Sequence, residues 1–78
     1  MLHVTDVRYQ GDYRLWLAFD NGIEGEVNLE SELWGEVFDP LLNKSVFASA
    51  RVDPELGTIV WANGADLAPE FLIDCLRA

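Results

Sequence analysis

The chain has 78 residues and a mass of 8.8 kDa, which allows one small domain but not a second hydrophobic core. Half of the residues are hydrophobic, which argues against disorder, and 14 acidic against five basic residues give a net charge of -9. This charge disfavours direct binding to nucleic acid or to anionic membranes. One cysteine, the lack of a signal peptide and the lack of a membrane-spanning apolar run favour a single cytoplasmic domain over residues 1–78.

The first part of the chain predicts three strands joined by two hairpins. Apolar residues in the range 2–9 precede the turn pair Gly11-Asp12, and residues 13–19 then alternate with the two-residue period of a half-buried strand. Asn21-Gly22 follows, which is a strong short hairpin signal, and residues 23–29 resume the alternation. We therefore expect the second and third strands to pair in an antiparallel manner.

The middle of the chain predicts less regular structure. Between residues 30 and 36 we expect one helical turn capped by Ser31, because Gly35 weakens a longer helix. Pro40 should then end regular structure before a strand over residues 46–52. Four apolar residues of this stretch are expected to return the chain to the core: Leu41, Leu42, Val46 and Phe47.

The last third predicts a second hairpin and a helix. Residues 53–57 supply a turn, residues 58–61 favour a strand, and Pro69 suits the first turn of a helix over residues 69–77. The helix face expected to cover the sheet consists of Phe71, Leu72, Cys75 and Leu76. The predicted fold is therefore α+β: a small antiparallel sheet of four to five strands in two hairpins, with the C-terminal helix packed on one face.

Negative charge is concentrated in residues 20–39, which contain seven acidic residues and no basic residue. Such a segment can attract a basic protein surface, and Trp34, which lies within it, is of a residue type that often anchors interfaces. The alternative is a solvated strand face and loop, with Glu24 and Glu26 pointing outward. The residues expected to bind a partner are Glu24, Glu26, Glu30, Glu32, Trp34 and Glu36.

Trp16 alternates out of phase with the apolar face of its strand, which places it on the opposite side of the sheet. Together with Trp34 it could form an exposed aromatic patch, and a homodimer would bury that patch. The alternative is that both sheet faces pack within the domain, one of them under the connection formed by residues 30–45.

No arrangement of residues predicts catalysis, a metal or a cofactor. His3 is the single histidine, so no histidine pair exists, and the sequence contains neither a nucleophile motif nor a glycine-rich phosphate loop nor the spacing of a calcium loop. Cys75 is expected to be a buried and unreactive thiol. We therefore expect a protein that is not an enzyme and that holds no metal or cofactor.

Residues 58–70, which read TIVWANGADLAPE, resemble the signature of the bacterial "domain of unknown function 2442" family. Matches at residues 20–22, 38–42 and 52–53 extend the resemblance over essentially the whole chain. It implies a small α+β fold without an established activity. It also implies a gene that often lies beside that of another small protein, an arrangement similar to toxin–antitoxin pairs.

Within this signature we expect structural roles for five residues: Trp61, Asn63, Gly64, Asp66 and Pro69. Trp61 should anchor packing, Asn63-Gly64 should form a turn, and Asp66 should accept a hydrogen bond at a turn or helix start.

Two hypotheses for function follow. The first is a non-enzymatic, antitoxin-like interaction module that binds a small basic protein through the acidic segment and Trp34. The alternative is a ligand-sensing input domain with a small pocket near Trp61, Asn63 and Asp66.

Overall fold

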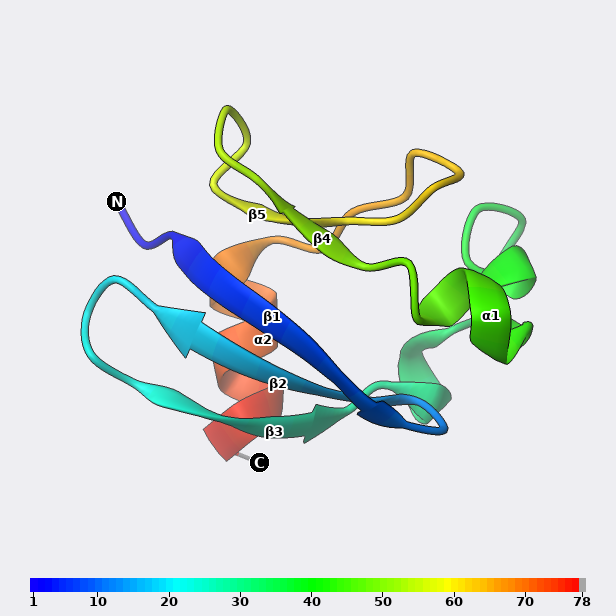
Figure 1. Cartoon of the computed structure of the whole chain (residues 1–78), viewed down its shortest axis with the longest axis horizontal. Coiled ribbons are helices and arrows are strands. Elements are labelled where there is room, and N and C mark those ends of the chain that lie inside the picture. Colours follow the sequence, from blue (N-terminus) through cyan, green and yellow to red (C-terminus); the bar gives the residue numbers. More distant parts are fainter. Residues whose placement is uncertain (78) are drawn as a thin grey trace.

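The computed structural model describes residues 1–77 and contains two antiparallel sheets and a C-terminal helix (Figure 1). The strands are β1 (Val4–Gly11), β2 (Arg14–Phe19) and β3 (Glu24–Asn28) in the first sheet, and β4 (Arg51–Asp53) and β5 (Thr58–Val60) in the second. Helix α2 extends from Pro69 to Arg77. The predicted α+β fold, its antiparallel hairpins and the bounds of its C-terminal helix are confirmed.

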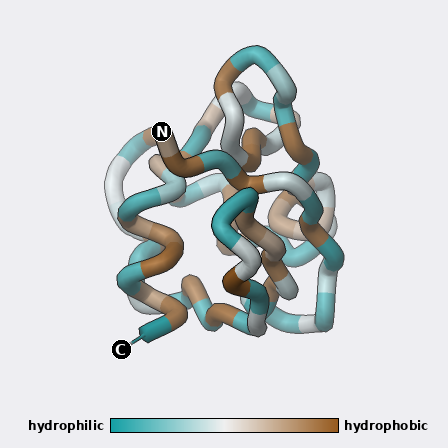
Figure 2. Tube along the Cα trace, turned by 90° about the vertical axis from the view of Figure 1, so that its left-hand side faces the viewer, coloured by the Kyte–Doolittle hydropathy of each residue, from teal (hydrophilic) through white to brown (hydrophobic). Residues whose placement is uncertain are grey.

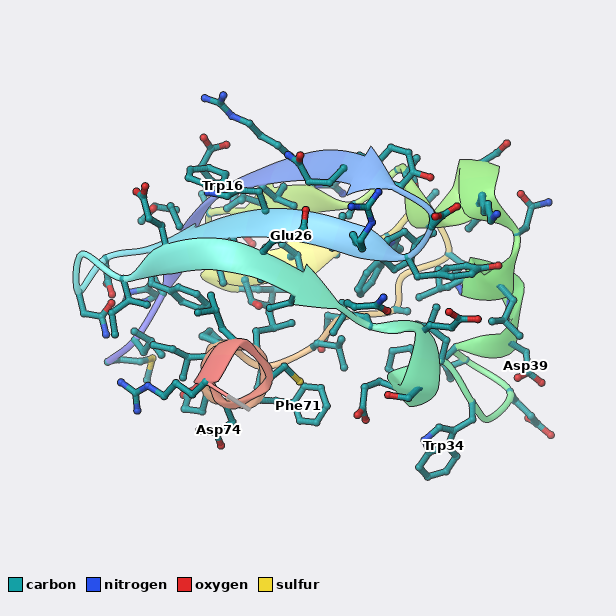
Figure 3. The ribbon with its side chains drawn as sticks, turned by 90° about the horizontal axis from the view of Figure 1, so that it is seen from below. Trp16, Glu26, Trp34, Asp39, Phe71 and Asp74 are labelled. Carbon is teal, nitrogen blue, oxygen red and sulfur yellow. The ribbon has the colours of Figure 1, made fainter. Side chains whose placement is uncertain are left out.

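The register of the first sheet separates an inner from an outer face. Leu15 lies opposite Val27 on the neighbouring strand, and both side chains are buried. Trp16 lies opposite Glu26, and these two side chains point to the other face, where Glu26 is exposed (Figure 3). The predicted alternation is therefore correct, because successive side chains of a strand point to opposite faces.

Helix α2 covers the inner face of the first sheet (Figure 1). Gly25 allows this close packing, since a Cβ atom at that position would lie 3.2 Å from Cδ2 of Leu76. Figure 2 shows the hydrophobic segments of α2 on the side toward the rest of the molecule. Within residues 1–77, no helix combines the length and the apolar character that a membrane crossing requires.

The buried face of α2 differs from the prediction at two residues: Ile73, which was not predicted to face the sheet, and Phe71, which was. Leu72 and Ile73 are buried, whereas Phe71 is 37% exposed. Successive helical residues are about 100° apart, so the arc from Leu72 through Leu76 to Ile73 leaves Phe71 about 100° beyond its edge at Leu72.

The second sheet lies beside the β1 edge of the first sheet. The amide of Val4 donates a hydrogen bond to the carbonyl of Gly57, with an N···O distance of 2.9 Å. Ile59 and Trp61, at the end of this second hairpin, are buried in the same core as the inner face of the first sheet. The two sheets and α2 therefore share one hydrophobic core.

The segment between β3 and β4 differs most from the prediction. It contains two 3₁₀ helices, η1 (Glu30–Glu32) and η2 (Asp39–Leu42), and the short helix α1 (Lys44–Phe47). The predicted capping role of Ser31 is wrong, because Leu29 precedes η1 and no side chain caps it. Pro40 lies inside η2 instead of ending regular structure, since proline is compatible with the first turn of a helix.

The strand predicted over residues 46–52 is also wrong, because β4 begins only at Arg51. The side chain of Asn43 accepts a hydrogen bond from the amide of Ser45 at 2.9 Å and begins α1. The helical turn places Phe47 in the core, where its ring centroid lies 5.5 Å from that of Tyr13 and 5.9 Å from that of Trp61. Leu42, predicted in the core, is exposed at the end of η2.

Candidate functional site

Trp34 projects into solvent because the residues around it fix the path of the chain. Leu29 and Leu33 are buried on either side of η1, so the chain enters the core immediately before Trp34. The side chain of Trp34 then points away from the sheet, on the side where α2 lies (Figure 3). It is 73% exposed, which is unusual for the largest apolar side chain.

The loop that carries Trp34 is held by hydrogen bonds on the C-terminal side of Trp34. Gly35 has a φ of +92°, a conformation that favours glycine, and its carbonyl accepts hydrogen bonds from the amides of Phe38 and Asp39 at 3.1 and 2.8 Å. The side chain of Asn63 donates to the carbonyl of Val37 at 2.9 Å. This tether, which sequence reasoning did not identify, joins the loop to the signature turn.

The acids of residues 20–39 divide into paired and unpaired groups. Asp20 lies 2.8 Å from Nδ1 of His3, and Glu26 lies 3.7 Å from the guanidinium of Arg14. Within residues 1–77, no ion pair involves the remaining acids, which are Glu24, Glu30, Glu32, Glu36 and Asp39. Four of these five lie in residues 30–39, which we call the acidic loop.

The six residues predicted to bind a partner do not lie on one surface. Glu24 and Glu26 belong to β3, on the same outer face as Trp16, whereas Trp34 projects on the opposite side of the sheet (Figure 3). The acidic loop contains Trp34 together with Glu30, Glu32 and Glu36. The six predicted residues therefore form two separate groups, one on β3 and one in the acidic loop.

An aromatic patch that combines Trp16 with Trp34 is therefore not formed. The guanidinium of Arg8 instead lies over the ring of Trp16, with its Cζ atom 5.2 Å from the ring centroid. Arg8 in turn lies 3.5 Å from Asp6. Trp16 thus has a cation–π contact with Arg8 on the outer face. The homodimer expected through a joint patch of Trp16 and Trp34 loses the patch that motivated it.

Helix α2 carries a half-buried thiol, Cys75, and an exposed ring, Phe71. Burial raises the pKa of the half-buried Cys75 thiol, and the negative charges of Glu32 and Asp74 raise it further. Phe71 and Trp34 project on the same side of the sheet (Figure 3).

Residues of the predicted signature form a structural network. The indole of Trp61 donates to the carbonyl of Phe47 at 2.9 Å, and the amide of Trp61 donates to the carbonyl of Ala65 at the same distance. The side chain of Asn63 accepts from the amide of Ala65 at 3.1 Å and closes the turn. Trp61 is 1% exposed, so its interpretation as a packing anchor is confirmed.

The hydrogen-bond role predicted for Asp66 is wrong. Its carboxylate accepts no hydrogen bond from another of residues 1–77, and Asp66 is exposed. The side chain of Asn63 already accepts the hydrogen bond from the turn amide, that of Ala65. The backbone of Asp66 pairs with that of Val60 as an isolated β-bridge. The contribution of Asp66 is therefore made by its backbone.

A family model described as "Protein of unknown function (DUF2442)" matches residues 4–76. The chain belongs to the DUF2442 family. No curated protein and no solved structure matches it. The description of DUF2442 names no activity, so the function must be argued from the surface of this chain.

The alternative site predicted near Trp61, Asn63 and Asp66 has no opening in this DUF2442 chain. Over residues 1–77 no pocket is present, and Trp61 is enclosed by the core. Over the same residues, no three side chains of His, Cys, Asp or Glu gather in a way that could hold a metal ion. His3 lies at the start of β1, where it contacts Asp20. The exposed Trp34 and the acidic loop around it form the candidate functional site.

Proposed function

We propose that this DUF2442 chain is a non-enzymatic protein-interaction module that binds a basic partner through the acidic loop, with Trp34 as the anchor. The observation that carries the proposal is a tryptophan side chain 73% exposed on a tethered loop. Tryptophan is enriched among the few residues that dominate binding energy at interfaces. Because the loop is held by hydrogen bonds at Gly35 and Val37, less conformational freedom is lost on binding.

The charge of the acidic loop determines the chemistry of the partner. Its four acids lack ion-pair partners among residues 1–77, so a partner surface rich in Lys and Arg would supply the missing countercharges. We expect an apolar pocket for Trp34 on that partner, surrounded by basic side chains. Such attraction is screened over about 8 Å at physiological ionic strength. Neutralisation of a small basic partner, in an antitoxin-like manner, would be one form of this function.

The experiment is capture of the partner from the native host by tagged protein at low and high salt. Trp34→Ala should weaken binding of the captured protein by at least about 30-fold, which corresponds to the roughly 2 kcal/mol of an interface hot spot. The double variant Glu30→Lys with Glu36→Lys should weaken it and reduce its dependence on salt.

The matched control is Glu55→Lys with Asp66→Lys, which makes the same change in net charge at two exposed acids outside the acidic loop. We expect this control to retain most of the binding. A partner held equally well by the Trp34→Ala variant, or weakened equally by both double variants, would contradict the proposed site.

A further inference from the structure

The outer edge of β3 carries backbone groups that no strand pairs. The amide of Phe19 donates to the carbonyl of Ile23, and the amide of Leu29 donates to the carbonyl of Tyr13, both at 2.9 Å. In an antiparallel pair, hydrogen-bonded and non-hydrogen-bonded positions alternate. The register of β2 and β3 therefore directs the amides and carbonyls of Glu24, Glu26 and Asn28 away from β2.

This edge is open, whereas the other edge of the first sheet is not. Among residues 1–77 no strand lies beyond β3, and α2 packs on the face of the sheet and not along its edge (Figure 1, Figure 3). Within residues 1–77, Glu24, Glu26 and Asn28 make no backbone hydrogen bond to a turn or loop. On the β1 side, by contrast, Val4 donates to Gly57 of the second hairpin. An unpaired edge is a template for an added strand.

We propose that the edge of β3 binds an extended segment of a partner protein as a fourth strand, in which basic and apolar residues alternate. This site is separate from the Trp34 anchor and goes beyond the proposed function. Main-chain hydrogen bonds to Glu24, Glu26 and Asn28 would supply affinity, and the side chains on each face would supply specificity.

The side chains of β3 select the alternating pattern. Glu24 and Glu26 both point to the outer face, where side chains of an added strand would lie about 5 Å away, so Lys or Arg is favoured at alternate positions. Glu24 has no ion-pair partner among residues 1–77. The residues between them would face the α2 side, beside Gly25 and the half-buried Leu76, where apolar side chains are favoured.

The same charges oppose a second copy of this chain as the occupant. Full-length antiparallel pairing of two β3 strands would place Glu26 opposite Glu26 of the other copy. Like charges directly opposite one another destabilise a strand pair, and charged edges resist self-association. A basic segment has the complementary charge and is therefore the favoured occupant.

The test uses the full chain, labelled with ¹⁵N, and a blocked synthetic peptide of the sequence Thr-Lys-Val-Lys-Val-Lys-Thr. We expect the peptide at about millimolar concentration to slow amide exchange of Glu24, Glu26 and Asn28 at least tenfold, with little change at Gly25 and Val27. A control peptide of the same composition, Thr-Lys-Lys-Lys-Val-Val-Thr, should protect these amides much less. Absence of protection, or equal effects of both peptides, would overturn the proposal.

A matched pair of variants separates the backbone from the charge. Glu26→Pro removes an amide that β2 does not use, and proline is tolerated on edge strands. We expect it to abolish the protection of Glu24 and Asn28, whereas Glu26→Gln, which keeps the amide, should weaken binding only several-fold. Peptide protection in unmodified protein is decisive if the proline variant does not fold.

Two further outcomes distinguish the possibilities. The Trp34→Ala variant should still show protection of the β3 amides by the peptide. If the peptide protects no amide while partner capture still depends on Trp34, the strand proposal is overturned and the proposed function is not. Protection of Glu24, Glu26 and Asn28 in free protein that disappears on dilution would identify a second copy as the occupant and would also overturn the proposal.

Discussion

Trp61 and Trp34 lie in regions of opposite character. Trp61 is 1% exposed, packs against Phe47 and donates its indole hydrogen to a backbone carbonyl, whereas Trp34 is 73% exposed on the acidic loop. The two regions are nevertheless linked, because the side chain of Asn63 in the signature turn donates a hydrogen bond to the carbonyl of Val37 in the acidic loop. The comparison shows that residues 61–65 build the fold and, through Asn63, hold a loop whose tryptophan is exposed.

The largest expected effect is the difference in unfolding free energy between the Trp61→Ala and Trp34→Ala variants. Trp61→Ala removes a fully buried ring and should lower the free energy of unfolding by about 3–5 kcal/mol. This is a large part of the roughly 4–12 kcal/mol available to a chain of 78 residues. Trp34→Ala should change the free energy of unfolding by less than about 0.5 kcal/mol. Urea unfolding followed by circular dichroism measures both values.

Similar losses in the two variants would mean that Trp34 supports the fold, and the contrast between the regions would then fail.

A smaller effect is expected from the tether between the regions. Asn63→Ala removes hydrogen bonds to Val37 and from Ala65, and it should lower the free energy of unfolding by about 1–2 kcal/mol. Asn63→Asp is the matched variant, because it keeps an acceptor for Ala65 but loses the donor to Val37. The indole N–H of Trp34 should show greater nanosecond mobility in both variants by ¹⁵N relaxation.

An Asn63→Asp variant with an unchanged Trp34 order parameter would show that the loop is held by other contacts.

The first sheet and α2 were predictable because their patterns are local and strong. Leu15, Leu17 and Phe19 alternate with the period of a strand, and Pro69 marks the start of the helix. These signals match their tertiary environment, since the alternating residues are the ones buried under α2.

The middle of the chain was not predictable in the same way because a tertiary contact decides its structure. Residues 46–52 show a strand-like alternation, yet a helical turn ends at Phe47, whose ring is buried against Tyr13 and Trp61. Likewise, the acids near Trp34 indicated a charged segment, but the turn of the chain after Leu29 places Trp34 and Glu26 on opposite sides of the sheet. No local pattern specifies that turn.

The smallest expected effect concerns an acid that, unlike those of the acidic loop, has a partner. The amide of His3 donates to Asp20 at 3.1 Å, and Nδ1 of His3 lies 2.8 Å from its other oxygen. The hydrogen bond from the amide and then that from the ring lower the pKa of Asp20 below its ordinary value of 3.8. A carboxylate with a lowered pKa in the folded state stabilises that state above the unfolded pKa, and this contribution is lost as pH falls through the folded value.

Asp20→Ala should therefore be less stable than the unmodified protein at neutral pH, with a difference that shrinks as the pH falls below 3.8. Glu36→Ala, which removes an exposed acid of the acidic loop without an ion-pair partner among residues 1–77, should not show this pH-dependent loss. Thermal unfolding of the three proteins between pH 2 and pH 7 measures the difference. The loss of stability in the Asp20→Ala variant could instead stay constant over that pH range. In that case packing of the Asp20 side chain, and not its charge, would link the start of β1 to the turn before β3.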